Sequence, residues 1–168
     1  MRKPAVFLDR DGVINHDLGY IHDFKNFKVK IGVIKGLRFL SKKKYLIFIV
    51  TNQSGIAKGF FTEQNYKNLT KKIIIFFKKK GVKFNKISYC PYHPKAKIKK
   101  YRKKTNLRKP GNKMIEDIKK RWRIDLKRSF MIGDRKSDSM AAKKSKLYFE
   151  YPKKNFYSQI KKINRFLI

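Results

Sequence analysis

Acidic residues are scarce in this chain. Its 168 residues include 11 Asp and Glu against 46 Lys and Arg, which gives a formal net charge of +35 at pH 7. A strongly positive surface attracts phosphate backbones without regard to sequence, so a nucleic-acid function has to be considered. The basic residues number 11, 18 and 17 in successive thirds of the chain, whereas a dedicated binding face should show stronger clustering. We therefore interpret the charge as a compositional bias over a solvated surface and expect no nucleic-acid partner.

Cysteine and long apolar runs are scarce too. The single cysteine, Cys90, excludes an intrachain disulfide, and the longest apolar run, 45–50, is far too short to span a bilayer. The N-terminal residues lack the apolar core and the small-residue cleavage site of a signal peptide. Hydrophobic residues nevertheless make up 41% of the chain, enough to form a core. We expect one domain over 1–168, in a monomeric cytoplasmic protein without a membrane partner.

Short apolar runs alternate with helical patterns along the chain. The apolar runs predict strands at Ala5–Leu8, 45–50, Lys86–Cys90, Phe130–Ile132 and 147–149. Helical spacing of apolar residues predicts four helices, with buried faces at Val33/Leu37/Leu40, Tyr66/Leu69/Ile73/Phe76, Met114/Ile118/Trp122 and Phe156/Ile160/Ile163. The first should end near Lys44, and Thr62 should cap the second. Residues 91–110 form a long polar loop. Alternating strands and helices indicate an α/β fold with a parallel sheet.

The few aspartates are grouped. Six of the eight fall into two segments, an early one with Asp9, Asp11, Asp17 and Asp23 and a late one with Asp134 and Asp138. Asp favours turns, which would explain one Asp at a strand end but not two such groups. In parallel sheets, ligands bind beyond the carboxyl ends of the strands. If the first and fourth strands are neighbours, Asp9, Asp11 and Asp134 can surround one Mg²⁺.

Four ordered motifs resemble those of the haloacid dehalogenase superfamily of phosphatases. They are Phe7-Leu8-Asp9-Arg10-Asp11-Gly12-Val13, Thr51-Asn52-Gln53-Ser54-Gly55-Ile56, Arg108-Lys109-Pro110 and Gly133-Asp134-Arg135-Lys136-Ser137-Asp138. More narrowly, the chain resembles the D-glycero-D-manno-heptose 1,7-bisphosphate 7-phosphatases over essentially its whole length. The resemblance implies a three-layer α/β/α Rossmann-like fold with a central parallel sheet of about five strands and no large cap domain. It also implies removal of the 7-phosphate in ADP- or GDP-heptose biosynthesis for lipopolysaccharide.

The residue types suit phosphate ester hydrolysis through a covalent intermediate. A carboxylate can attack phosphorus to form an aspartyl-phosphate, and Asp9 at the strand end is the candidate nucleophile. Asp11 is close enough to protonate the leaving alkoxide and then to deprotonate the attacking water. The resemblance implies the same two roles, with Mg²⁺ held by Asp9, the backbone carbonyl of Asp11, and Asp134.

The resemblance assigns the remaining charge and hydrogen bonds. Thr51 would hydrogen-bond the transferring phosphoryl group, and Lys109 would balance its charge. Asp138 is expected to orient Lys109 or a metal-bound water rather than to bind the metal. With 36 lysines in the chain, only the Arg-Lys-Pro context distinguishes Lys109.

Substrate contacts are assigned around these groups. Asp17 can accept hydrogen bonds from sugar hydroxyls, and Arg108 has the fork geometry to bind a second phosphate or ring hydroxyls. Tyr20 lies in the segment that contacts the sugar in the resembled family, although a turn followed by a core aromatic explains it equally well. The full expected set is Arg10, Asp17, Tyr20, Asn52, Gln53, Ser54 and Arg108.

One departure from the resembled family concerns zinc. That family usually carries a Cys-x-His and a Cys-x-Cys pair before Arg-Lys-Pro, and such a sulfur–nitrogen site is structural. The corresponding positions here are Cys90, Tyr92, Thr105 and Leu107, and His93 is one residue out of register. A single thiolate cannot hold structural zinc, so we expect none.

Three other functions stay open. A histidinol-phosphate phosphatase would share the chemistry, but Asn-Gln-Ser-Gly-Ile after Thr51 looks more like the heptose branch. A basic nucleic-acid-binding protein on a retained phosphatase scaffold is the second, and the intact acidic motifs argue against it. A polynucleotide 3′-phosphatase would combine the same motifs with a basic surface. The expected partner is therefore a small sugar bisphosphate.

Overall fold

Five parallel strands form the centre of the molecule. The structure is a computed structural model that describes residues 2–167; the expected domain over 1–168 therefore includes two residues outside the described range. The strands are β1 (Ala5–Leu8), β2 (Leu46–Asn52), β3 (Lys86–Cys90), β4 (Phe130–Ile132) and β5 (Tyr148–Glu150). Their order in the sheet is β3-β2-β1-β4-β5. The first and fourth strands are therefore neighbours, with Leu8 paired to Ile132.

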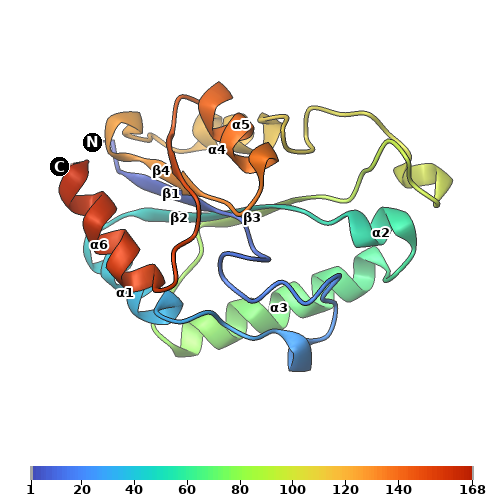
Figure 1. Cartoon of the computed structure of the whole chain (residues 1–168), viewed down its shortest axis with the longest axis horizontal. Coiled ribbons are helices and arrows are strands. Elements are labelled where there is room, and N and C mark those ends of the chain that lie inside the picture. Colours follow the sequence, from blue (N-terminus) through green and yellow to red (C-terminus); the bar gives the residue numbers. More distant parts are fainter. Residues whose placement is uncertain (1, 168) are drawn as a thin grey trace.

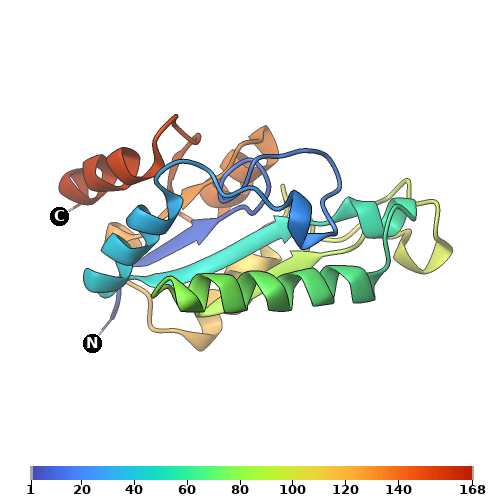
Figure 2. The same cartoon turned by 90° about the horizontal axis from the view of Figure 1, so that it is seen from below.

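Helices cover both faces of the sheet, as Figures 1 and 2 show. One face carries α1 (Val33–Lys42), α3 (Glu63–Lys79) and α6 (Phe156–Phe166), and the other carries α4 (Lys113–Arg121) and α5 (Lys136–Lys144). The short α2 (Ser54–Lys58) extends from the carboxyl end of β2. Three 3₁₀ turns complete the described elements, at Phe24–Asn26, Lys99–Tyr101 and Leu126–Arg128. The expected three-layer α/β/α fold is confirmed.

Side-chain alternation in the strands builds two separate cores. Val6 and Leu8 of β1 pack with the α1, α3 and α6 face, whereas Ala5 and Phe7 pack with the α4 and α5 face. All four side chains are fully buried. Because both faces are covered, a central parallel strand reads as a continuous apolar run, which is the pattern that marks β1 and β2 in the sequence.

Element ends differ slightly from the sequence expectation. The first helix ends at Lys42 rather than near Lys44, whose backbone is left-handed with φ 61°. Trp122 lies just beyond α4 in extended backbone, although its ring still packs on Phe48 at a centroid distance of 5.1 Å. The expected cap of the second helix is confirmed, because the Thr62 hydroxyl accepts from the Asn65 backbone N–H at 3.0 Å.

Backbone geometry delivers the polar residues to one edge of the sheet. Asp9 follows β1 directly, and its N–H donates to the Ile132 carbonyl of β4 at 3.0 Å. Thr51 and Asn52 are the last residues of β2. Between residues 2 and 167, no helix is long and apolar enough to cross a membrane.

Candidate active site

A pocket of about 590 Å³ opens at the carboxyl ends of β1, β2 and β4. Residues from all four sequence motifs line it, together with parts of the loops after β1 and β3. The lining residues are Asp9, Asp11, Asp17, Gly19, Tyr20, Thr51, Asn52, Gln53, Ser54, Gly55, Lys58, His93, Arg108, Lys109, Pro110, Arg135 and Ser137. The fold thus brings together the two acidic segments and the Arg-Lys-Pro motif.

Lys109 lies buried between two carboxylates. Its Nζ is 3.1 Å from Asp9 Oδ2 and 2.5 Å from Asp138 Oδ1. It also donates to the Val50 carbonyl at 2.8 Å. The backbone of Lys109 is held as well, because Asn52 Nδ2 donates to its carbonyl and Asn52 Oδ1 accepts from its N–H. Asn52 therefore holds the backbone of Lys109, and Asp138 contacts its ammonium; the orienting role of Asp138 stays a prediction.

Burial sets the protonation of this group. It raises the pKa of Asp9 to about 6, with Lys109 opposing the rise and Asp138 adding to it. Burial lowers the pKa of Lys109, but the attraction of Asp9 and Asp138 outweighs burial and the net shift is upward. The Lys109 ammonium is therefore charged at neutral pH. It lies between two carboxylates, so its single positive charge balances only part of their negative charge.

Three carboxylates of this cluster lie close together, and Asp9 and Asp134 are the two that fit a divalent cation, because Asp138 is paired with Lys109. Ligand atoms of Asp9, Asp134 and Asp138 lie within 4.8 Å of one another. Asp134 Oδ1 is buried and has no hydrogen-bond partner among residues 2–167. Burial, followed by the charge of Asp138, raises the pKa of Asp134. Hard oxygen donors with excess negative charge are what Mg²⁺ prefers, so the residues present fit such an ion.

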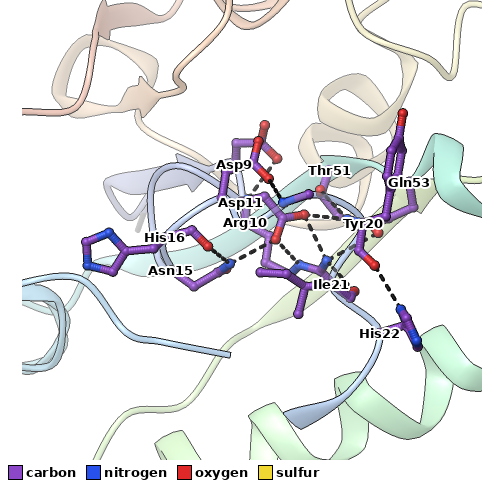
Figure 3. A network of polar contacts seen from close by, with 12 residues as sticks. Asp9, Arg10, Asp11, Asn15, His16, Tyr20, Ile21, His22, Thr51 and Gln53 are labelled. Carbon is purple, nitrogen blue, oxygen red and sulfur yellow. Dashed lines mark hydrogen bonds and ion pairs between the residues drawn. The ribbon is translucent and has the colours of Figure 1, made fainter. Parts of the chain in front are cut away.

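Asp11 is held by four hydrogen bonds, shown in Figure 3. Arg10 binds both carboxylate oxygens, at 3.1 Å through Nε and at 2.8 Å through a terminal nitrogen. Asn15 Nδ2 donates at 2.9 Å and Gln53 Nε2 at 3.0 Å. Burial raises the pKa of Asp11, but the charge and hydrogen bonds of Arg10, with those of Asn15 and Gln53, lower it overall. In this arrangement Asp11 is a carboxylate, ready to accept a proton.

The β2 motif supplies a polar wall. Thr51 is buried and its hydroxyl accepts from Gln53 Nε2 at 3.1 Å. Gln53 also accepts from Arg10 at 3.3 Å, so one amide links the hydroxyl to the Arg10–Asp11 pair. Ser54 opens α2 and lines the pocket.

Asp17, Tyr20 and Arg108, three of the expected substrate contacts, line the pocket. Asp17 is partly committed, because its carboxylate accepts from the Gly19 N–H at 3.0 Å and from Arg135 at 3.1 Å. Tyr20 is 42% exposed, so it is not a core aromatic, and its hydroxyl accepts from Lys58 Nζ at 2.6 Å. Arg108 is half-buried and donates to the Tyr92 carbonyl at 3.3 Å.

Arg10 is placed differently from the other expected substrate contacts. It is 2% exposed, points into the protein and does not line the pocket. Its terminal nitrogen donates to the Ile21 carbonyl as well as to Asp11. In this structure Arg10 positions Asp11, because the fold turns the residue between two pocket aspartates inward.

Sequence reasoning missed several pocket residues. Lys58, His93, Arg135 and Ser137 all line the cavity. Arg135 and Ser137 stand inside a quoted motif, so their position was a usable signal. Lys58 was hidden among many other lysines, and nothing in its local sequence separates it from them.

The positions related to zinc ligands are occupied by other contacts. Cys90 is buried, and its thiol donates weakly to the Tyr92 carbonyl at 3.9 Å. Leu107 packs against the core on the α4 and α5 face, and the Thr105 hydroxyl accepts from the Leu107 N–H at 3.2 Å. The absence of zinc stays a prediction.

Comparison with known proteins identifies the family. A family model described as polynucleotide kinase 3 phosphatase matches residues 13–161. The protein named D-glycero-beta-D-manno-heptose-1,7-bisphosphate 7-phosphatase from Photorhabdus laumondii is 44% identical to this chain. The match covers 86% of this chain and 77% of that relative. The relative of the same name in Escherichia coli K12 is 41% identical over 83% of this chain and 73% of its own length. The chain belongs to the family of the D-glycero-beta-D-manno-heptose-1,7-bisphosphate 7-phosphatases.

Solved structures of the phosphatase family share the fold. A HAD-like phosphatase from Mesorhizobium loti superposes with a TM-score of 0.88 at 24% identity, covering 99% of this chain and 88% of that one. The D,D-heptose 1,7-bisphosphate phosphatase of B. bronchiseptica, complexed with magnesium and phosphate, superposes with a TM-score of 0.82 at 21% identity. The match covers 96% of this chain and 98% of that one. The expected haloacid dehalogenase-like architecture is confirmed.

Proposed function

We propose that this phosphatase removes the 7-phosphate of D-glycero-β-D-manno-heptose 1,7-bisphosphate, with Mg²⁺ and through an aspartyl-phosphate on Asp9. The observation that carries the substrate assignment is the group of relatives of that name at 41% and 44% identity over most of the chain. The observation that supports the chemistry is a pocket carboxylate, Asp9, next to the buried Lys109 ammonium at a sheet edge.

The first step forms the covalent intermediate. An Asp9 carboxylate oxygen attacks phosphorus, and the bond between phosphorus and the sugar oxygen breaks. Asp11 then has to supply a proton to the leaving oxygen. Asp11 is a carboxylate paired with Arg10, so the proton that it delivers has to be taken up from solvent water before the bond to the leaving oxygen breaks.

The second step releases phosphate. Water attacks the aspartyl-phosphate, and Asp11 as a carboxylate takes the proton. The Asp9–phosphorus bond breaks, which returns the Asp9 carboxylate and liberates inorganic phosphate. The hydrogen bonds of Asn15 and Gln53 hold Asp11 in the base form that this step requires.

Charge balance is divided among fixed groups. The Lys109 ammonium would balance the charge of the transferring phosphoryl group and the Thr51 hydroxyl would hydrogen-bond it, a role supported by the fact that both residues line the pocket with Asp9. Asp9, Asp134 and the Asp11 carbonyl would hold Mg²⁺, which when bound neutralises the repulsion between carboxylates and a phosphate dianion. A monomeric state and a cytoplasmic location stay predictions.

Phosphate release from three substrates tests the proposal. The purified chain is assayed with heptose 1,7-bisphosphate, histidinol phosphate and a 3′-phosphorylated oligonucleotide, after chelation and with Mg²⁺ restored. We expect the highest kcat/KM for the heptose bisphosphate, with the 1-phosphate retained in the product as seen by ³¹P NMR. Equal kcat/KM for histidinol phosphate would defeat the specificity claim, and a clear preference for it would favour the histidinol-phosphate alternative.

The polynucleotide alternative has one observation in its favour. The matching family model carries a polynucleotide phosphatase description, and the net charge is +35. Non-specific electrostatic binding weakens steeply with salt. Sub-micromolar binding of the oligonucleotide together with rapid 3′-phosphate release would support this function over the sugar phosphatase.

A further inference from the structure

A long loop carries one wall of the pocket. The 91–107 loop leaves β3 after Cys90 and returns to the pocket at Arg108. It contains one 3₁₀ turn, Lys99–Tyr101, and is otherwise irregular. Figures 1 and 2 both place its middle, around the 3₁₀ turn, beside α2 and beyond the end of the sheet. The positions of His93 and Arg108 therefore depend on how this loop is held.

The loop is tied together by its own hydrogen bonds. The His93 N–H donates to the Tyr101 carbonyl at 3.1 Å, and Arg102 Nε donates to the Ala96 carbonyl at 2.8 Å. Arg108 donates to the Tyr92 carbonyl at 3.3 Å, which joins the end of the loop to its beginning. These hydrogen bonds lie within the 91–108 segment, so its placement on the protein depends on its contacts with other elements.

Apolar contacts supply part of that anchor. Ala96 and Tyr101 are buried in a cluster with Ile56, Ala57 and Phe61, and with Tyr66 of α3. The Ile98 N–H donates to the Ala57 carbonyl of α2 at 3.1 Å. These contacts fix the height of the loop above α2.

Glu63 supplies the charged part. It is the first residue of α3, and its Oε2 accepts from the Tyr101 hydroxyl at 2.9 Å. Its Oε1 accepts from the Tyr89 hydroxyl of β3. One carboxylate therefore joins the loop to the strand from which the loop departs. The loop itself has seven Lys and Arg and no acidic residue, and the charge of its Lys100 acts on Glu63 together with that of Lys67 of α3, which lies 3.9 Å from Glu63 Oε1.

The ionisation of Glu63 agrees with this arrangement. The hydrogen bond from Tyr89 lowers the pKa of Glu63, burial opposes it, and the bond from Tyr101 lowers it further. Because the pKa falls on folding, the contribution to stability is present above pH 4.5 and is lost as the pH falls through the folded value. The clamp is therefore complete at neutral pH.

We propose that Glu63 is a positioning residue whose carboxylate clamps Tyr89 and Tyr101, and so holds the 91–107 loop with His93 and Arg108 at the pocket wall. The effect on the bisphosphate rests on the proposed function, whereas the effect on the loop does not. A loop that detaches would weaken binding of the substrate end remote from Asp9 and leave the reacting end in place.

Three variants and one control test the clamp. Glu63→Ala removes the acceptor, whereas the double variant Tyr89→Phe/Tyr101→Phe keeps Glu63 and both rings and removes only the two hydroxyl donors. Glu116→Ala, on α4 beside Lys119, is the matched control because it also deletes one surface carboxylate. Glu63→Gln keeps an acceptor oxygen and should rescue part of the effect.

Two readouts separate the clamp from general destabilisation. Amide hydrogen exchange over 91–107 should accelerate roughly tenfold or more in the first two variants, as expected for loss of charge-assisted hydrogen bonds, and stay unchanged in the control. The KM for heptose bisphosphate should rise by about tenfold, while kcat and KM for p-nitrophenyl phosphate stay near wild type.

The outcomes are distinct. Unchanged loop exchange in the double Phe variant would overturn the proposal, even if Glu63→Ala failed to fold. Equal losses on both esters would also overturn it, since that pattern indicates damage to the catalytic centre. If the wild type did not hydrolyse heptose bisphosphate, the substrate assignment would fail, and loop exchange alone would decide the role of Glu63.

Discussion

At the scale of single residues, the pKa of Asp9 is set by burial and by a neighbouring ammonium. It is 7% exposed, it lies 3.1 Å from an ammonium, and its pKa is still raised to about 6. Burial therefore outweighs the attraction of Lys109. A bound cation would therefore stabilise the Asp9 carboxylate, whereas burial without a neighbouring positive charge destabilises it.

The first prediction concerns turnover by Asp9→Asn. A neutral amide cannot attack phosphorus to give the acyl phosphate, so kcat should fall below about one hundredth of wild type while the circular dichroism spectrum is retained. Steady-state phosphate release measures this. A variant that kept more than that fraction would remove Asp9 from the nucleophile role.

The second prediction concerns stability and pH in the metal-free protein. The pKa of Asp9 rises from 3.8 to about 6 on folding, so the folded state binds more protons than the unfolded state between these values. The free energy of unfolding should therefore fall as the pH rises through this window, by up to about 3 kcal/mol. Asp9→Asn should lack this decline and be the more stable protein at neutral pH.

Urea unfolding at about pH 4.5 and pH 7, in chelator, checks the sign, because the pH-dependent difference between the two proteins isolates Asp9. A wild type that gained stability relative to Asp9→Asn on going to neutral pH would contradict the shift.

At the scale of elements, the turn between β4 and α5 positions two site aspartates. Gly133 ends the strand region, and Asp138 returns from α5 to pair with Lys109 and to accept from the Arg135 N–H at 3.0 Å. A Cβ built on Gly133 would lie 2.2 Å from Asp138 Cβ. Glycine is therefore required here by the close approach of the helix.

The third prediction is the effect of Gly133→Ala. The added methyl group must displace Asp138, which costs about 1–3 kcal/mol of stability and disturbs the orientation of Lys109. The free energy of unfolding and kcat should both fall. In the matched variant Gly81→Ala the added Cβ would meet only Arg38 Nε, at an ordinary contact distance of 4.0 Å, so it should lose stability only through its φ of +75° and keep its kcat.

The loop that ends at Arg108 carries the fourth prediction. Arg108→Ala removes a guanidinium that can bind the second phosphate of a bisphosphate, so discrimination between heptose bisphosphate and its monophosphate should shrink by roughly tenfold or more. Hydrolysis of p-nitrophenyl phosphate should be nearly unchanged. Discrimination that survived this substitution would place the second phosphate elsewhere.

At the scale of the whole molecule, metal content is the fifth prediction. Elemental analysis of the purified chain should show no stoichiometric zinc, because Tyr92, Thr105 and Leu107 stand where zinc ligands are expected. Chelation should abolish phosphatase activity and Mg²⁺ should restore it. One tightly held zinc per chain would contradict the first part, and activity that survived chelation would contradict the second.

Local patterns in the sequence determined much of this protein. Apolar runs marked β1 and β2, and the aspartates that follow strands marked the site edge. Hydrophobic pattern and turn chemistry act between residues close in sequence, so they can be recognised without coordinates. The ordered motifs added the family, and with it the roles expected of Asp9 and Asp134.

Only the tertiary structure decided which groups share a charge. The pairing of β1 with β4 brings Asp134 to Asp9, and the β3–α4 connection carries Lys109 between Asp9 and Asp138. The tertiary structure also buries Arg10 and brings Glu63 to the Tyr101 hydroxyl, whose hydrogen bond it accepts. Burial and Coulomb interactions depend on distances between segments remote in sequence, and those distances exist only once the whole core has packed.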